Sequence, residues 1–580
     1  MARIDTITTH SAQRPTIRQL LSRTRSRLIV NVALLLLSLV MLGVAALQMR
    51  GYEDGITRTS FTLQQAIPLP VLKFTPAHNR GNVVAVIVHG YSADKEMMSG
   101  LAVDLARAGV TTYTYDLPGH GASTAPYGAP GTHNVVPRLV SSLGEVVDYA
   151  LAHAYTPHPR LVLIGYSIGT IAAGEYALQH PELSTLQATV LVAGVLNDQP
   201  TPSNPRNLLV LSGQFDLPGI NDISRKLIAS GCDVPVARVD DSYSCAVAAS
   251  QNQTGMRQRE VLPGLDHISI ITAGSTHTMI LQWLGATVDP SITSNRVVGD
   301  ARIHWMLFGL FGAALGALAL IGLGSTWLRL APAAGEVTAA ATAHAEHSPS
   351  RRALWPRLGV IAGALAIGLA AMRWWLPTDF WLPEPAPFGF IQQQVSGDVA
   401  LLLLVAGVVL WAAVRFVPGV RSLAEWPARS RILPQVALAG AVAVFLYFTL
   451  GKISSFGWES LALSPARLWR AGVYVLMIWP FFCAVQALLA GYARRTGRGA
   501  RADLAATLLI VASFMGAILL NFGRLSYLGI LLPVVAILLL AFIGLSAWTR
   551  RAVGMPVWLI SGAQALLMGW LLAATLPLLG

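Results

Sequence analysis

Charged residues are scarce in this chain. Asp, Glu, Lys and Arg make up only 12% of its 580 residues, against about 25% in a typical soluble protein. Residues 28–47 contain no charge, and from about residue 302 onward apolar stretches alternate with short loops. Each stretch is roughly 20 residues long, the length that a helix needs to cross a bilayer. The pattern excludes an ordinary soluble protein and predicts a polytopic membrane protein.

The apolar stretches predict nine membrane-spanning helices. The first could instead be a secretory signal, but its apolar run is long for one and no clean A-x-A cleavage site follows. Eight further spans would form an all-α transmembrane domain over 303–580, and only residues 48–302 read like a soluble domain. The nine predicted spans are 28–47, 303–328, 357–376, 398–417, 433–451, 469–490, 503–521, 525–548 and 554–578.

Acidic residues are fewer than basic residues, and the formal net charge is +12. Arginines gather in residues 1–27 and in every second loop after the first span, whereas the loop 377–397 has no Lys or Arg. This positive-inside pattern predicts a cytoplasmic N-terminus, a cytoplasmic linker over 329–356 and a soluble domain outside the cytoplasm. Arginines scattered in this way do not indicate nucleic-acid binding. One outer loop fits poorly, because it carries Lys452, Arg467 and Arg470.

Cysteine is also rare, with three in the chain. Cys232 and Cys245 fall in the predicted extracytoplasmic domain, where an oxidising compartment allows them to pair. The alternative is two free, buried thiols. Cys483 lies within a predicted span, where we expect it only to pack. No metal site is predicted and no cofactor is expected, since His344 and His347 lie in an Ala-rich linker.

The soluble part shows apolar, β-branched runs that alternate with helical patterns. Such alternation predicts an α/β fold with a mostly parallel sheet covered on both faces. In such sheets the reactive groups collect at the carboxyl ends of the strands. We expect strands at 83–88, 110–115, 161–164, 189–192, 208–211 and near 260–262, one or two leading strands in 59–75, and helices at 94–108, 137–154, 168–179, 221–229 and 275–284.

One motif predicts a nucleophile. Residues Gly165 to Gly169 read G-x-S-x-G, with Ser167 at the centre, between an apolar strand and a helix rich in small residues. A serine on such a tight turn exposes its hydroxyl, and the flanking glycines let the helix approach the strand. The N-terminus of the helix also favours the negative charge that develops during attack.

Residues 60–287 resemble the α/β-hydrolase superfamily, and within it the branch of monoglyceride lipases and serine aminopeptidases. The resemblance is carried by the G-x-S-x-G turn, by His89-Gly90-Tyr91 and the run DLPGHGAS at 116–123, each after a strand, and by Gly213-Gln214-Phe215-Asp216. His267 then follows in PGLDHI. The order Ser, Asp, His along the chain is the one that this fold uses.

The resemblance implies a catalytic triad of Ser167, Asp216 and His267. The hydroxyl of Ser167 needs a base to take its proton, and His267 would be that base, oriented by Asp216. His277 is a rival base, although it falls in a helical stretch. Asp266 is expected to be a solvated loop carboxylate. The rival acids are Asp222, Asp240 and Asp241, which lack the G-x-x-D position after a strand.

The oxyanion hole needs backbone N–H donors. By resemblance these come from Tyr91 and Ile168. His89, Gly90, Gly165 and Gly169 are expected to shape the two loops that carry these donors. Asp116 and His120 are expected to belong to a structural turn.

The resemblance departs at one place. Relatives insert a helical cap between the strand after the elbow helix and the strand that bears the acid, but here only residues 193–206 fill that place, with three prolines among them. A lipase-like lid is therefore not expected. The insertion between the two cysteines could shade the site instead.

These features predict a membrane-anchored serine hydrolase that cleaves an acyl ester, lipid-like in character. An acyltransferase, peptidase or amidase would use the same triad. The spans could instead form a transporter or lipid-handling unit with an accessory hydrolase, but ion coupling usually needs ionisable groups at mid-membrane, and Arg373, Asp398 and Arg470 lie near span ends. A degenerate, binding-only domain is disfavoured by the intact motif. No protein partner is predicted.

Overall fold

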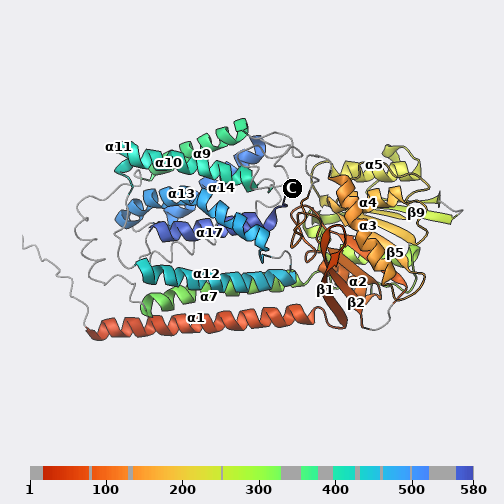
Figure 1. Cartoon of the computed structure of the whole chain (residues 1–580), viewed down its shortest axis with the longest axis horizontal. Helices are drawn as coiled ribbons and strands as arrows, with labels where there is room; N and C mark the ends of the chain where they lie inside the picture. The colour runs from red at the N-terminus through yellow and green to blue at the C-terminus, as the bar shows by residue number, and fades with distance from the viewer. Residues whose placement is uncertain are drawn as a thin grey trace, which may run out of the picture.

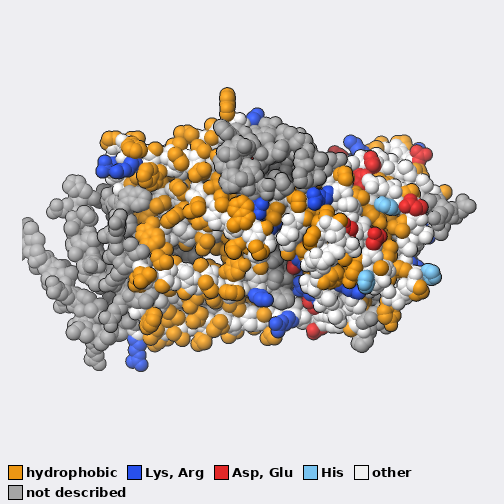
Figure 2. Space-filling model, in the orientation of Figure 1, with side chains coloured by type: hydrophobic (Ala, Val, Ile, Leu, Met, Phe, Trp, Pro, Cys, Tyr) orange, Lys and Arg blue, Asp and Glu red, His pale blue; other side chains and the backbone are white. Residues whose placement is uncertain are grey.

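The computed structural model describes residues 17–77, 81–127, 135–249, 253–327, 354–375, 393, 396–424, 432–457, 461–496, 499–520 and 557–578. An α/β domain lies at one end of a bundle of long helices (Figure 1). On the face shown in Figure 2, hydrophobic side chains dominate the helical part, whereas acidic side chains gather on the α/β domain.

Nine strands form one sheet in the order β1-β2-β4-β3-β5-β6-β7-β9-β8. The inner run from β4 to β9 is parallel throughout, whereas β1, β2 and β8 pair antiparallel at the two edges. The prediction of a mostly parallel sheet is confirmed. The strands are β1 Ile56–Gln64, β2 Pro68–Pro76, β3 Val83–Val88, β4 Thr111–Tyr115, β5 Arg160–Tyr166, β6 Leu186–Val192, β7 Leu208–Phe215, β8 Ser242–Ala249 and β9 Gln253–Asp266.

Helices cover both faces because the central strands are apolar on both sides. In β3 every residue is buried. Val83, Ala85 and Ile87 pack with α2 and α6, whereas the alternate residues of the strand pack with α3, α4 and α5; this is the two-residue period of a strand. The helices are α2 Ser99–Arg107, α3 Val136–Ala152, α4 Gly169–Gln179, α5 Ile220–Cys232 and α6 Gly274–Thr287.

Two elements differ from the sequence-based expectation. Helix α2 starts at Ser99 rather than at Asp94, because the Asp94 carboxylate accepts hydrogen bonds from the backbone N–H groups of Glu96 and Met97 and holds a turn there. Strand β8 was not expected. It is an edge strand with few buried side chains, so no continuous apolar run marks it in the sequence.

Among the described residues, eight helices are long and apolar enough to cross a membrane. They match eight of the nine predicted spans, and the ninth, 525–548, lies outside the described residues, as does most of the linker 329–356. The helices are α1 Ile17–Gly51, α7 Arg302–Trp327, α9 Trp355–Trp375, α10 Ser396–Phe416, α12 Ile432–Gly457, α13 Pro465–Thr496, α14 Gly499–Leu520 and α17 Val557–Thr575; a short helix, α11 Pro418–Arg421, follows α10.

Helix α1 packs along α7 through small residues, as is usual for helices in membranes. A side chain at Gly312 would meet the Cβ of Met41 at 2.9 Å, and one at Gly316 would meet the hydroxyl of Ser38 at 2.5 Å. The Ser38 hydroxyl also donates to the Gly312 carbonyl at 2.7 Å.

The α/β domain is fixed to α1 and α7 rather than loosely tethered. Tyr52, directly after α1, donates a hydrogen bond from its hydroxyl to the carbonyl of Gly299 at 2.6 Å. The guanidinium groups of Arg107 and Arg302 make cation–π contacts with the Tyr52 ring, at 4.7 and 5.6 Å from its centroid. Arg302 opens α7 and pairs with Asp300 at 2.6 Å. Both chain crossings between the two parts therefore meet at one buried cluster.

Candidate active site

Three side chains from three different strand ends meet at the carboxyl edge of the sheet. Ser167 follows β5, Asp216 follows β7 and His267 follows β9. The Nδ1 atom of His267 lies 2.6 Å from Oδ1 of Asp216, and its Nε2 atom lies 3.0 Å from Oγ of Ser167. The parallel order of the strands thus brings together residues that are 49 to 100 positions apart in the chain. This geometry lets Nε2 of the imidazole take the hydroxyl proton of Ser167, while the carboxylate of Asp216 binds the Nδ1 atom of the same ring.

Ser167 occupies a strained turn. Its φ is +52°, a conformation that costs a non-glycine residue about 1 kcal/mol or more. The two flanking glycines are required for space, because a Cβ at Gly165 would lie 2.4 Å from the Gly169 carbonyl oxygen, and one at Gly169 would lie 2.4 Å from that of Val88. The turn therefore lets α4 pack closely against β3 and β5, and the Ser167 hydroxyl points toward His267.

Asp216 is held in one orientation by backbone donors. Its Oδ1 atom accepts the N–H of Leu217 at 2.8 Å in addition to the His267 imidazole, and its Oδ2 atom accepts the N–H of Gly213 at 3.1 Å. Its side chain is fully buried, and that of His267 is only 9% exposed. Burial strengthens the attraction between the carboxylate and the imidazolium that forms when Ser167 loses its proton.

The loop that carries Tyr91 runs directly beside the nucleophile. A Cβ at Gly90 would lie 3.0 Å from the Cβ of Ser167, so the backbone of the next residue, Tyr91, is adjacent to the reacting hydroxyl. Ile168 is the N-cap of α4 on the other side of Ser167. The roles of the Tyr91 and Ile168 N–H groups as oxyanion donors stay a prediction, and this placement supports them.

His89 and Asp116 shape these loops. The Nδ1–H of His89 donates to the Gly90 carbonyl at 2.8 Å, and its Nε2 atom accepts the Leu117 N–H at 2.9 Å. Burial lowers the pKa of His89 to about 4, so the ring is neutral at pH 7 and keeps both bonds. Asp116 is buried and accepts both the N–H and the ammonium of Lys95. Both residues contact backbone groups or the Lys95 ammonium, and their structural role stays a prediction that these contacts support.

The rival residues lie apart from this group. His277 is buried on α6, between the carboxylate of Asp104 at 2.7 Å and the carbonyl of Ile271 at 2.8 Å. The rival acids lie around α5 and the start of β8: the side chains of Asp222 and Asp241 are 71% and 74% exposed, and Asp240 offers its carbonyl to Arg259.

Two residues near His267 hold its loop. Asp266 is exposed, and its carboxylate accepts the N–H groups of Ile268 and Ser269 at 3.0 and 2.7 Å. Tyr166 donates from its hydroxyl to the His267 carbonyl at 2.8 Å. The role of Tyr166 was missed in the sequence, because it fills a variable position of G-x-S-x-G and only the fold shows which loop lies opposite.

No helix lies between β6 and β7, a segment that is fully described. Residues 193–207 instead fold back onto α4, where the Glu175 carboxylate accepts the N–H groups of Asn197 and Asp198 at 2.9 and 3.0 Å. The expectation of a missing helical cap is met. Next to the triad in sequence, Phe215 is 66% exposed.

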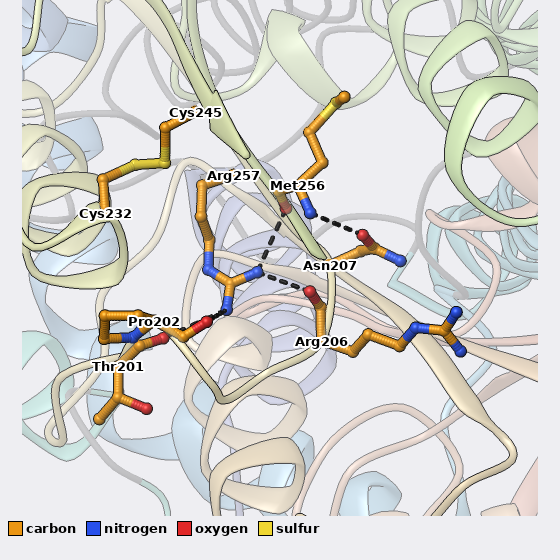
Figure 3. The surroundings of a disulfide bond; sticks show 8 residues. All are labelled: Thr201, Pro202, Arg206, Asn207, Cys232, Cys245, Met256 and Arg257. Carbon is orange, nitrogen blue, oxygen red and sulfur yellow. Dashed lines mark hydrogen bonds between the residues drawn. A yellow bond between two sulfur atoms is a disulfide. The ribbon is translucent and has the colours of Figure 1, made fainter. Parts of the chain in front are cut away.

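The structure joins Cys232 and Cys245 in a disulfide (Figure 3). The bond lies beside Arg257, whose buried guanidinium donates to the carbonyls of Arg206, Thr201 and Pro202. Arg257 precedes Asp266, the last residue of the same strand, by nine positions, which corresponds to about 30 Å. The disulfide end of the insertion therefore lies far from the site and does not shade it, whereas the Asp241 carbonyl accepts the N–H of Val261, five positions before Asp266; shading by residues 233–241 stays a prediction.

The carboxyl edge of the sheet faces the helix bundle. Tyr91 packs both against the core of the α/β domain and against the core formed by α9, α10, α13, α14 and α17. In the loop after β4, the Gly119 carbonyl accepts the Nη2–H of Arg467 from α13 at 2.8 Å. The same carbonyl accepts the N–H of Leu578, just beyond α17, also at 2.8 Å. The candidate site therefore lies next to the ends of predicted membrane spans.

Comparison with known proteins agrees with this fold. Residues 78–216 match the family model of the serine aminopeptidases, S33. This chain carries an α/β-hydrolase domain. The match ends at the predicted catalytic acid, Asp216, and does not reach His267 or the helix bundle. No curated protein matches the chain.

Two solved structures of hydrolases are similar to this domain. A predicted CIB-like hydrolase from Thermoplasma acidophilum is 16% identical and aligns over 40% of this chain and 99% of its own, with a TM-score of 0.31. A dienelactone hydrolase from Anabaena variabilis is 18% identical, with the same coverages and a TM-score of 0.30.

Proposed function

We propose that this protein is a membrane-anchored serine hydrolase that cleaves acyl esters. The observation that carries the proposal is the hydrogen-bonded series Ser167–His267–Asp216, at 3.0 and 2.6 Å, on a strained turn beside the Tyr91 loop. A buried carboxylate, an imidazole and a hydroxyl in this order form the arrangement that activates a serine for acyl transfer.

The proposed reaction has two halves. Oγ of Ser167 attacks the acyl carbon while His267 Nε2 takes the hydroxyl proton, and the carbonyl oxygen becomes an oxyanion that accepts the N–H groups of Tyr91 and Ile168. The C–O bond to the alcohol then breaks, and the alcohol leaves with the proton from His267. Water attacks the acyl-enzyme with His267 again as base, and the carboxylic acid and free Ser167 are released.

We further propose that the hydrolase domain lies outside the cytoplasm. Two described segments that carry arginines, the start of α1 and the short helix α11, lie at the end of the helix bundle away from this domain (Figure 1), as the positive-inside rule requires. Arg467, one of the cations that fitted this pattern poorly, is buried and 2% exposed. Its guanidinium is bound by backbone carbonyls of α17 and of the hydrolase domain, which is a structural reason for a cation on that side.

The position of the site supports a membrane-presented substrate. The carboxyl edge that holds Ser167 faces the ends of α13 and α17, and the described segment 193–207 between β6 and β7 forms no helix there. We propose that an acyl ester held in the membrane reaches the site from this side, since transfer through water would cost its acyl chain about 0.8 kcal/mol for each exposed CH₂.

Surface dilution tests the proposed substrate class. The full chain is reconstituted in phosphatidylcholine vesicles and given 4-methylumbelliferyl oleate or acetate, which share a leaving group. We expect the oleate rate to follow its mole fraction in the membrane at constant bulk concentration, and the acetate rate to follow bulk concentration. An oleate rate that ignores mole fraction would contradict access from the membrane. The variant Ser167→Ala gives the background of both assays.

The family match favours a second candidate substrate class. Because residues 78–216 match serine aminopeptidases, the same acyl-enzyme could form from an aminoacyl amide. Aminoacyl 4-methylcoumarin amides, assayed beside the two esters, separate the classes. A kcat/KM for an amide that exceeds those of both esters would assign the protein to the peptidases. Acyl transfer is detected in the same assay as an acylated product when a long-chain alcohol is added as acceptor.

A further inference from the structure

Arg467 of α13 joins the helix bundle to the hydrolase domain through one buried guanidinium. Its Nη1 atom lies 2.6, 3.0 and 2.8 Å from the carbonyl oxygens of Ala573, Ala574 and Leu576 at the end of α17. A cation is favoured there, because the last carbonyls of a helix lack partners within the helix. Its Nη2 and Nε atoms donate to the carbonyls of Gly119 and Gly121 at 2.8 and 3.1 Å.

The chain beyond α17 makes a second junction with the same loop. The N–H of Leu578 donates to the Gly119 carbonyl, and the Leu578 carbonyl accepts the N–H of Tyr127, both at 2.8 Å. Gly119 has a φ of +78°, and a Cβ there would lie 2.6 Å from the Leu578 carbonyl oxygen. Glycine is therefore required at this position by the approach of the helix bundle as well as by the turn itself.

The clamped loop supports the residues next to the nucleophile. Between the two bound carbonyls lies His120, which is buried with its ring centroid 5.2 Å from that of His89 and 5.8 Å from that of Tyr91, both edge-on. His89 in turn bonds the Gly90 carbonyl, and Tyr91 offers the predicted oxyanion N–H. A continuous series of contacts thus runs from α13 to the Tyr91 loop.

We propose that Arg467 is a positioning residue for the oxyanion hole, so that the membrane domain completes the active site of the hydrolase domain. The inference rests on the proposed serine-hydrolase function. Arg467 touches no reacting atom; it fixes the loop 119–121, whose His120 sets the place of Tyr91. Misplacement of a donor by about 1 Å costs on the order of 100-fold in rate, and loss of one donor costs about 10²–10³-fold.

The test uses the full chain with Arg467→Met and Arg467→Lys. We expect Arg467→Met to lower kcat for 4-methylumbelliferyl acetate by about 10- to 100-fold with KM within about threefold, because an oxyanion contact forms only in the transition state. A trifluoromethyl ketone inhibitor, which becomes an oxyanion when Ser167 adds to it, should weaken by the same factor. Arg467→Lys should restore little, since one ammonium cannot span both sets of carbonyls.

Two controls make the result decisive. Arg470→Lys alters the next arginine on α13, whose guanidinium bonds the Ala466 carbonyl of its own helix, and should leave kcat within about twofold. Leu578→Pro removes the N–H that Gly119 accepts, together with the leucine side chain, and should lower kcat in the same sense. Leu578→Ala also removes the side chain but keeps both backbone bonds, and should not lower kcat. The Leu578 pair decides the question if Arg467→Met fails to fold.

Folded Arg467→Met and Leu578→Pro proteins with unchanged kcat and unchanged inhibitor affinity would overturn the inference, as would a loss confined to KM. If Ser167→Ala has lost turnover in the same assays, the serine-hydrolase proposal survives that result. If Ser167→Ala keeps turnover, the proposed function fails first, and the two failures are thereby distinguished.

Discussion

Replacement of Asp216 by asparagine tests the hydrogen bonding of the triad at one atom. Oδ1 accepts from both His267 Nδ1 and Leu217 N, at 2.6 and 2.8 Å, and Oδ2 accepts from Gly213 N at 3.1 Å. A carboxylate satisfies all three donors, whereas an amide has only one acceptor oxygen. In Asp216→Asn the amide nitrogen therefore opposes one donor, the Gly213 N–H, in one orientation, and two donors, those of His267 and Leu217, in the other.

Both orientations impair catalysis. With the amide nitrogen toward Gly213, the imidazolium that forms during attack loses its buried counter-charge. With the nitrogen toward His267, Nδ1 must become an acceptor, so the proton moves to Nε2, the atom that has to receive the Ser167 proton. We expect a loss in kcat on the order of 10⁴-fold, the effect of this change in another Ser-His-Asp triad. That factor corresponds to about 5.5 kcal/mol of transition-state stabilisation.

The assay is turnover of 4-methylumbelliferyl acetate by the detergent-purified full chain. The matched control is Asp222→Asn, which changes a side chain that is 71% exposed on α5, and it should keep kcat within about twofold. Folding is checked by the melting temperature of each variant. A folded Asp216→Asn protein with kcat within tenfold of the wild type would remove Asp216 from the mechanism.

Three further predictions follow from the described residues. First, burial lowers the pKa of His89 to about 4 and that of His120 below its ordinary value. Below about pH 6.5 the unfolded chain therefore binds protons at these two residues that the folded domain does not bind. The stability of the folded domain should fall between pH 6.5 and 4, by up to about 3 kcal/mol for His89. Melting temperatures at pH 7 and 4.5 measure the fall, which His89→Asn should reduce; an equal fall in that variant would contradict the assignment. Second, protease added to intact cells with a permeabilised outer layer should cut within 48–302 and spare 329–356, and the reverse pattern would invert the topology. Third, replacement of both Cys232 and Cys245 by serine should cost about 3 kcal/mol of stability for a loop of this size, which a lower melting temperature would show. It should leave kcat unchanged, since the disulfide lies far along β9 from His267. A large loss of kcat would refute that separation.

Much of the α/β domain was predictable because its signals are local. The run VVAVIV of β3 is buried on both faces, and this burial is what makes a central parallel strand continuously apolar. Ser167 and Asp216 each directly follow a strand that contains such an apolar run, and His267 directly follows the more polar β9. The parallel order of these strands brings all three residues to one edge. Eight predicted spans agree with described helices for a similar reason, since length and apolarity decide them.

What escaped prediction depends on pairings between distant segments. Strand β8 is an exposed edge, so its few buried residues give no pattern, and the distance of the disulfide from the site followed only from the register of β8 with β9. Tyr166 contacts a residue 101 positions away in the chain, and Arg467 contacts the loop after β4, which lies 346 or more positions away. In the sequence, Arg467 is a cation in a predicted outer loop and does not fit the positive-inside pattern. The sequence alone does not show that its guanidinium binds backbone carbonyls in a buried junction.

The most direct measurement is the labelling of Ser167 itself by a fluorophosphonate probe. The probe phosphonylates an activated serine, so the wild-type chain should label at one site, which peptide mass spectrometry should identify as Ser167. Ser167→Ala should label at background level and lose ester turnover while it remains folded and inserted in the membrane. Undiminished labelling or turnover in that variant would place the nucleophile elsewhere and contradict the proposed function.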